Sequence, residues 1–144
     1  MTLPLVTIYT DGGCDPNPGA GAWAALIIAD SKKTELSGFD QVSTNNRMEL
    51  TAAIEALSSI KQPSRITLFT DSQYLQKGID EWMPKWLARN WRATNGPVKN
   101  QDLWKRLLDA EKPHQVTWKW VKGHSGDPNN MRVDLLVHQA RKKG

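Results

Sequence analysis

Two segments of the chain, TIYTD and TLFTD, each end an apolar stretch with a Thr-Asp pair. Asp11 and Asp71 therefore each follow a short run of the composition typical of a β-strand. Carboxylates that follow neighbouring strands lie at the same edge of a sheet. Glu49 begins an apolar helical stripe, and Asp134 lies near the start of the last predicted helix. The sequence thus offers four carboxylates that the fold would bring together.

A cluster of carboxylates predicts a bound cation. Two unit charges about 4 Å apart, at an effective dielectric constant near 20, repel each other by about 4 kcal/mol. An all-oxygen ligand set favours Mg²⁺ or Mn²⁺ over zinc. Two such ions activate a water molecule and stabilise the leaving oxygen in phosphodiester cleavage. Taken singly, each of these residues is better explained as a turn or helix-cap residue than as a catalytic one.

The elements that must position these carboxylates follow from apolar periodicity. We expect helices from Thr44 or Asn45, as N-cap, to near Pro63, and over 72–78, 100–111 and 130–142. Strands are expected at 5–10, 22–29, 32–39, 65–71 and 115–121. Pro84, Gly96 and Pro97 are expected to break the stretch before the third helix. This order predicts an α/β fold whose mixed sheet starts as an antiparallel meander and grows by parallel additions through helical crossovers.

Length and composition limit the class of protein. A chain of 144 residues with 39% hydrophobic residues is expected to form one globular domain over 1–144. Cys14 is the single cysteine, which excludes an intramolecular disulfide. We find neither a signal peptide nor an apolar run of the roughly 18 residues that a membrane span needs. We therefore expect a cytoplasmic protein without membrane contact, and we expect it to be a monomer.

The positive charge is concentrated in one segment. Residues 77–106 hold seven Lys and Arg residues against three Asp and Glu residues, which accounts for the net charge of +4 of the whole chain. Four of the seven tryptophans lie in the same segment, and helical spacing favours a core position for most of them. A strip of one sign suits phosphate groups, although a solvated helical face is the alternative. Its members are Lys85, Arg89, Arg92 and Lys99.

Five segments together resemble type 1 ribonuclease H of the bacterial kind. They are YTDGGCDPNPGAGAWA, STNNRMELTAAIEAL, FTDSQYL, NGPVKNQDLWKRL and WVKGHSGDPNNMRVD, in this order over nearly the whole chain. The resemblance implies a ribonuclease H-like fold, with a five-stranded mixed sheet flanked by helices. It also implies hydrolysis of the RNA strand of RNA/DNA hybrids, leaving 5′-phosphate and 3′-hydroxyl ends.

The same resemblance implies roles for individual residues. Asp11, Glu49, Asp71 and Asp134 match the metal-binding carboxylates of the family, which hold two Mg²⁺ ions with substrate bound, with Mn²⁺ as an alternative. His124 matches a loop histidine that assists proton transfer or product release; read without the family, it is equally a solvated loop residue. The basic segment matches a protrusion, at about residues 80–100, that grips the DNA strand.

Further residues are candidates for reading the hybrid. Short amides beside the carboxylates both donate and accept hydrogen bonds and can read a 2′-hydroxyl, but each is also a common turn or capping residue. Gly12 and Gly13 would let the backbone turn close to the nucleic acid. Cys14 is read as a small packed residue whose backbone contacts the RNA, in preference to a nucleophile. The candidate substrate-binding residues are Cys14, Asn17, Thr44, Asn45, Asn46, Gln73 and Trp82, with the basic strip.

The chain departs from the family pattern near its last helix, at Asp127, Met131 and Leu135. These departures concern the loop and the affinity for metal, not the class of reaction. Two other functions fit parts of the sequence: a DNA-processing enzyme of the same fold, such as an integrase or a resolvase, and a non-catalytic nucleic-acid-binding module. The intact set of four carboxylates argues against the second.

Overall fold

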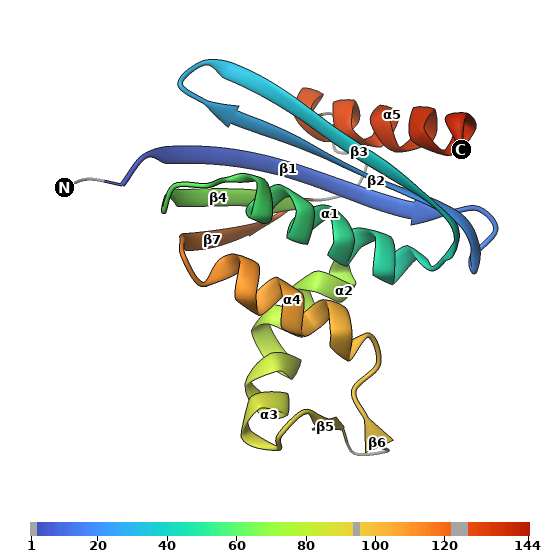
Figure 1. The fold of residues 1–144 in the computed structure, drawn as a ribbon, viewed down its shortest axis with the longest axis vertical. Helices are drawn as coiled ribbons and strands as arrows, with labels where there is room; N and C mark the ends of the chain where they lie inside the picture. Colours follow the sequence, from blue (N-terminus) through green and yellow to red (C-terminus); the bar gives the residue numbers. More distant parts are fainter. Residues whose placement is uncertain (1–2, 94–95, 122–126) are drawn as a thin grey trace.

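The structure, a computed structural model, describes residues 3–93, 96–121 and 127–144. Five strands form one sheet in the order β3-β2-β1-β4-β7, in which β1 and β2, and β2 and β3, are antiparallel, while β4 is parallel to β1 and to β7. The expected mixed α/β sheet is thereby confirmed (Figure 1). The strands are β1 (Leu5–Cys14), β2 (Gly19–Ala29), β3 (Lys32–Ser43), β4 (Arg65–Thr70) and β7 (Gln115–Trp120).

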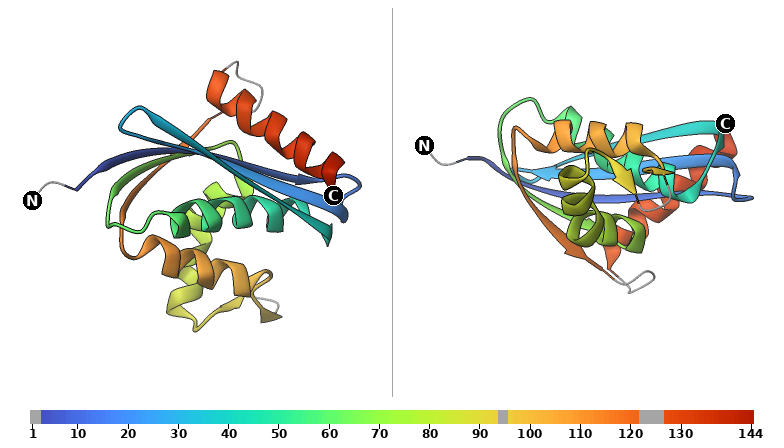
Figure 2. Two further views of the ribbon diagram at one scale, coloured as in Figure 1. Left: turned by 45° about the horizontal axis from the view of Figure 1, so that its top comes forward. Right: turned by 90° about the horizontal axis from the view of Figure 1, so that it is seen from below.

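Helices cover both faces of this sheet (Figure 2). Helix α5 (Pro128–Lys143) packs on β1, β2 and β3 on one face, while α1 (Asn45–Ser59) packs on β1 and β2 on the other face and against α4 (Gln101–Glu111). A helical run of α2 (Gln73–Lys77), the π-helical turn Gly78–Trp82 and α3 (Met83–Ala88) leads away from the sheet, followed by the two-stranded ribbon of β5 (Arg92–Ala93) and β6 (Gly96–Pro97). None of the helices in the described ranges is long and apolar enough to cross a membrane.

The apolar residues form two clusters, one on each side of the sheet. The larger cluster joins the sheet to α1 and α4 and includes Leu50, Leu68 and the fully buried Trp104. The smaller cluster lies under α5 and includes Tyr9, Leu26 and Val133. Successive side chains of a strand point to opposite faces, so Ile8 of β1 belongs to the larger cluster and Tyr9 to the smaller one.

The first strand is longer than expected. The sequence predicts that β1 ends near Asp11, but it continues through Gly12 and Gly13 to Cys14, which pairs with Gly21 of β2. Gly12 pairs with Trp23 and Gly13 with Ala22 of β2, so the turn begins only after Cys14. The prediction of a turn directly after Asp11 is therefore wrong, and β2 and β3 likewise extend beyond their expected ends.

Pro84 does not break the chain where the sequence predicts a break. It stands in the first turn of α3, directly after the π-helical turn, a position where proline is tolerated because few N–H groups there have helical partners. The last helix also begins earlier than expected, at Pro128, because the Asp127 carboxylate accepts hydrogen bonds from the N–H groups of Asn129 and Asn130 at 2.8 and 3.3 Å.

Gly78 is required by packing, and we expect Gly78→Ala to destabilise the protein. An added Cβ atom would overlap the ring of Trp104, which is fully buried. Overpacking of this kind costs about 1–3 kcal/mol, which outweighs the gain of about 1 kcal/mol in helix propensity. Urea unfolding measures the change, with Lys77→Ala at the exposed neighbouring position as a control expected to stay within about 0.5 kcal/mol. A Gly78→Ala protein as stable as the wild type would contradict this packing.

Candidate active site

The register of two parallel strands places Asp11 beside Asp71. Tyr9 of β1 pairs with Phe69 of β4, and each Asp follows its strand residue by two positions. The pKa of Asp11 is raised from an ordinary 3.8 to about 8. Burial is the largest cause, and the negative charge of Asp71 raises the pKa further. The hydrogen bond from the Gly12 N–H lowers the same pKa but does not outweigh the other effects.

Asp134 joins this pair from α5, which covers the face of the sheet to which Tyr9 and Phe69 point. Its charge and a side-chain hydrogen bond to Asp11 both raise the pKa of Asp11. The side chain of Asp134 is 46% exposed, and its Oδ2 lies 3.9 Å from Nε2 of His138 one helical turn later. Three of the four predicted carboxylates thus converge from β1, the end of β4 and α5.

Glu49 approaches from α1, because α1 lies directly against β1. A Cβ atom on Gly12 would meet the backbone carbonyl carbon of Met48 at 2.5 Å and the N atom of Glu49 at 2.7 Å, so only glycine permits this approach. Helix packing therefore requires glycine at position 12, and the contact with nucleic acid that the sequence suggests for it stays a prediction.

A hydroxyl group holds the Glu49 side chain. The Ser72 Oγ donates a hydrogen bond to Glu49 Oε2 and, at the N-terminus of α2, accepts one from the Leu75 N–H. Burial raises the pKa of Glu49 to about 7, the Ser72 hydrogen bond opposes this, and the charge of Asp71 adds to it. Because Asp71 acts on the pKa of both Asp11 and Glu49, it lies at the centre of the carboxylate cluster.

These four carboxylates fit a hard divalent cation by their chemistry. All of their donor atoms are oxygen, which suits Mg²⁺ or Mn²⁺, and their mutual repulsion is relieved by positive charge. Within the described ranges, no group of three or more His, Cys, Asp or Glu side chains lies in an arrangement that could by itself hold a metal ion. Mg²⁺ is characteristically held by one or two carboxylates together with water and substrate phosphates, so an open arrangement is compatible with it.

Several predicted substrate-binding residues form one connected group beside the carboxylates. The Asn45 Oδ1 accepts a hydrogen bond from the Cys14 N–H at 2.7 Å, and the Asn17 Oδ1 accepts one from the Asn45 N–H at 3.1 Å. Thr44 is the N-cap of α1, because its Oγ1 accepts from the Arg47 N–H at 3.2 Å. The capping role expected for Thr44 is confirmed. Asn46 and Gln73 are exposed near the starts of α1 and α2, while His124 lies outside the described residues.

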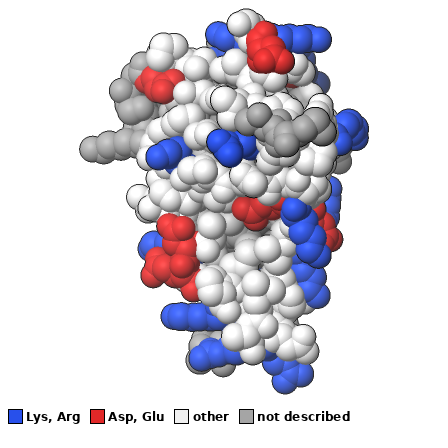
Figure 3. All heavy atoms as spheres, turned by 90° about the vertical axis from the view of Figure 1, so that its left-hand side faces the viewer, with Lys and Arg blue, Asp and Glu red and all other residues white. Residues whose placement is uncertain are grey.

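The basic strip lines one groove. A hollow of about 530 Å³ lies between α3, the ribbon and the start of α4, and we call it the basic groove. All four members of the basic strip are exposed, and Figure 3 shows Lys and Arg side chains at the end of the molecule formed by α3 and the ribbon. Trp82 and Trp86 are half-buried, so the expected core position holds fully only for Trp104. The residues that line the basic groove include Tyr74, Trp82, Lys85, Arg89, Arg92 and Lys99.

Comparison with known proteins decides the family. The RNase H family model matches residues 4–142, and a ribonuclease H of Gluconobacter oxydans is 55% identical over 97% of this chain and 94% of its own length. The chain belongs to the ribonuclease H family. A crystal structure of a type 1 RNase H with the type 2 active-site motif matches with a TM-score of 0.90 at 28% identity, over 99% of this chain and 74% of that one.

A second solved RNase H, crystallised with an RNA/DNA hybrid, shares the RNase H fold. It matches with a TM-score of 0.73 at 19% identity, over 96% of this chain and 97% of that one. The resemblance recognised in the sequence and the RNase H-like fold it implied are both confirmed.

Sequence reasoning missed residues of this RNase H that support the candidate site. Ser72 directly follows Asp71, and its position as N-cap of α2 was recognisable, but its bond to Glu49 depends on the packing of α1. His138 stands four residues after Asp134, a spacing that does place side chains on one helix face. Tyr74 and Asn100 meet only because α2 and α4 come together.

Proposed function

We propose that the chain is an endonuclease that hydrolyses the RNA strand of RNA/DNA hybrids in a reaction that depends on divalent cations, leaving 5′-phosphate and 3′-hydroxyl ends. The observation that carries the proposal is the convergence of Asp11, Asp71 and Asp134 at one edge of the sheet, with charges that act on one another. Family membership supports the same activity, as does a neighbour of the same fold that was crystallised with a hybrid.

Four carboxylates would hold the cations, namely Asp11, Glu49, Asp71 and Asp134. We propose two Mg²⁺ ions when substrate is bound, with Mn²⁺ as a possible replacement. Divalent cations held there would supply the positive charge that activates a water molecule and stabilises the leaving oxygen. The Ser72 hydroxyl orients Glu49 for this role.

His124 is proposed to assist the proton transfers of the reaction or the release of product. A histidine ionises close to neutral pH and so can take up and return a proton during turnover. This role comes from the position of His124 in the family motif.

The two strands of the hybrid would contact different parts of the protein. We propose that Cys14, Asn17, Thr44, Asn45, Asn46 and Gln73 contact the minor groove and the nearby backbone beside the carboxylates, where a 2′-hydroxyl distinguishes RNA from DNA. The basic groove would take the DNA strand. Its four exposed cations suit phosphates, and the half-buried Trp82 would lie against a deoxyribose.

We further propose that the chain acts as one RNase H domain, as a monomer in the cytoplasm and without membrane contact, with the basic protrusion at about residues 80–100. Helix α3 and the ribbon lie on the side of α4 away from the sheet (Figure 1), which supports a protruding surface at this position.

A cleavage assay on three substrates tests the function. Purified protein with Mg²⁺ should cut the labelled RNA strand of an RNA/DNA hybrid and leave duplex RNA and duplex DNA intact, and end analysis should find 5′-phosphates. Cleavage of duplex DNA would instead support a DNA-processing enzyme of the same fold. Binding without any cleavage, in Mg²⁺ and in Mn²⁺, would support a non-catalytic module.

A further inference from the structure

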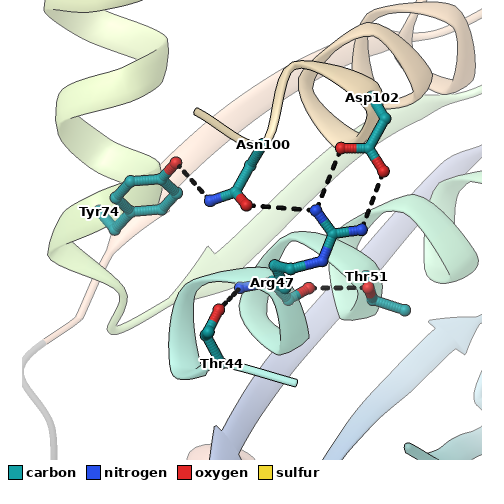
Figure 4. A network of polar contacts seen from close by, with 6 residues as sticks. All are labelled: Thr44, Arg47, Thr51, Tyr74, Asn100 and Asp102. Carbon is teal, nitrogen blue, oxygen red and sulfur yellow. Dashed lines mark hydrogen bonds and ion pairs between the residues drawn. The ribbon is translucent and has the colours of Figure 1, made fainter. Parts of the chain in front are cut away.

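A chain of hydrogen bonds links the start of α1 to the basic groove (Figure 4). The Arg47 Nη1 donates to the Asn100 Oδ1 at 3.2 Å, and the Asn100 Nδ2 donates to the Tyr74 hydroxyl oxygen at 3.0 Å. The Trp104 Nε1 also donates to that oxygen, at 3.0 Å. Asp102 holds the Arg47 guanidinium through both carboxylate oxygens, at 3.1 and 2.8 Å.

The direction of each bond in this chain is fixed by the groups themselves. A guanidinium only donates, so the Asn100 amide must turn its oxygen toward Arg47 and its NH₂ group toward Tyr74. An indole N–H also only donates. The Tyr74 oxygen therefore accepts two hydrogen bonds, and its single hydrogen is left to donate elsewhere.

The Asn100 side chain bonds to Arg47 and Tyr74 and does not cap its own helix, α4. It is the N-cap residue of α4, a position where Asn normally accepts from the backbone, but its side chain makes no capping bond. Its φ of 57° lies in the left-handed region, which side chains other than glycine adopt at some cost. The bidentate contact with Asp102 fixes the Arg47 guanidinium. Arg47 in turn holds the Asn100 amide with its NH₂ group toward Tyr74.

The remaining hydrogen of Tyr74 has no acceptor in the described part of the protein: within these ranges no residue accepts a hydrogen bond from this hydroxyl. Tyr74 lines the basic groove together with Lys85 and Lys99. The Tyr74 hydroxyl thus offers a hydrogen-bond donor beside lysine side chains, and this combination suits an anionic oxygen. Hydrogen bonds to charged acceptors are stronger than those to neutral ones.

We propose that the Tyr74 hydroxyl is a dedicated hydrogen-bond donor to one backbone phosphate oxygen of the nucleic-acid strand in the basic groove, with Asn100 and Arg47 as the positioning residues that fix its polarity. This rests on the proposed function, since it assumes that a hybrid occupies the groove. It adds a directional contact to the groove, which four flexible cations do not provide.

A substitution on each side of the contact tests the proposal. Hybrids carrying one neutral methylphosphonate at successive DNA positions are bound in Ca²⁺, which we expect to permit binding without cleavage. Tyr74→Phe should bind the unmodified hybrid about tenfold more weakly, as expected for loss of a hydrogen bond to a charged group. At one position, the methylphosphonate should reduce the affinity of the wild type by a factor about ten times larger than the factor for Tyr74→Phe. Equal penalties at every position would overturn the proposal, because the hydroxyl would then contact no phosphate.

A second variant reverses the polarity and keeps every bond satisfied. In Asn100→Asp the new carboxylate still accepts from Arg47, and it must also accept from Tyr74, which turns the hydroxyl hydrogen away from the groove. We expect about tenfold weaker binding than for Gln101→Glu, a control that adds the same charge one residue away. In a Tyr74→Phe background the two changes should be equivalent. An Asn100→Asp protein that binds like Gln101→Glu in the wild-type background would overturn the assigned polarity.

Different results would overturn the proposed function and the role of the Tyr74 hydroxyl. A wild-type protein that binds no hybrid at any salt concentration overturns the proposed function and this inference with it. A wild type that binds hybrid, beside a Tyr74→Phe variant of equal affinity, overturns the role of the hydroxyl alone. Thermal unfolding of each variant separates both results from a loss of folded protein.

Discussion

Replacing Asp11 with Asn will abolish cleavage of an RNA/DNA hybrid in Mg²⁺ while the protein stays folded. The substitution keeps the shape of the side chain but removes one carboxylate from a cluster in which Asp11, Asp71 and Asp134 act on each other. Asp71→Asn should have the same effect, because Asp71 acts on both Asp11 and Glu49. Single-turnover cleavage of an end-labelled hybrid measures the loss, with Asp109→Asn on the exposed side of α4 as a control of full activity.

The same substitution should stabilise the protein when no metal is present. Asp11 has an ordinary pKa of 3.8 and a pKa of about 8 in the folded protein. Folding therefore favours the protonated form, and this contribution to the free energy of unfolding is lost as pH rises from about 4 to about 8. Asn does not ionise and escapes the loss, so at pH 8 the variant should be more stable by at least about 1 kcal/mol.

Thermal unfolding at pH 4 and pH 8 in a chelator checks the sign. The difference between Asp11→Asn and the wild type should be larger at pH 8, and added Mg²⁺ should reduce it by binding to the wild type. Cleavage by Asp11→Asn at the wild-type rate would refute the assignment of the active site. A variant less stable than the wild type at pH 8 would refute the electrostatic account.

Removing the positive charge of the basic groove will weaken hybrid binding more at low salt than at high salt. The factor by which affinity falls should be about a hundred times larger at 50 mM than at 200 mM salt. If Lys85, Arg89, Arg92 and Lys99 each neutralise one DNA phosphate, together they contribute a slope of roughly −3 to −4 to the dependence of log affinity on log salt. Changing all four to Ala should flatten the measured slope by that amount. The Michaelis constant should rise and the turnover number should be spared, because these groups act equally in the ground and transition states.

A matched variant separates phosphate contacts from net charge. Four exposed lysines away from the groove can be changed to Ala with the same loss of charge: Lys32, Lys33, Lys61 and Lys112. Filter binding in Ca²⁺ at several salt concentrations should give this control a slope close to that of the wild type. If both quadruple variants change the slope equally, the groove makes no specific phosphate contacts and is only a solvated face.

The carboxylate pair was predictable because it depends on local patterns. Two apolar strands each end in Thr-Asp, which places Asp11 and Asp71 at one edge of the sheet if the strands are parallel neighbours. Strands β1 and β4 are parallel neighbours. The approach of Glu49 was expected from the apolar stripe of its helix. What the sequence did not reveal is why the approach succeeds, since Gly12 is needed by the backbone of α1 at Met48, a contact between segments far apart in the chain.

Other features depend on long-range contacts that carry no local signal. The extension of β1 to Cys14 needs the partner strand β2, and Pro84 stands inside a helical run, in the first turn of α3 and directly after a π-helical turn. The chain from Arg47 to Tyr74 joins three helices. The hollow formed by the basic strip depends on the ribbon, whose strands of two residues each are too short to show a pattern.

The division of the apolar residues into two unequal clusters makes the two sides of the sheet differ in local opening free energy. Helix α5 rests on the smaller cluster, whereas α1 and α4 share the larger one. Amide hydrogen exchange in α5 should therefore proceed through sub-global opening at lower free energy than exchange in α1 or β4. Each such opening withdraws Asp134 from the other carboxylates, so a transiently inactive but mostly native species belongs to the equilibrium ensemble of this protein.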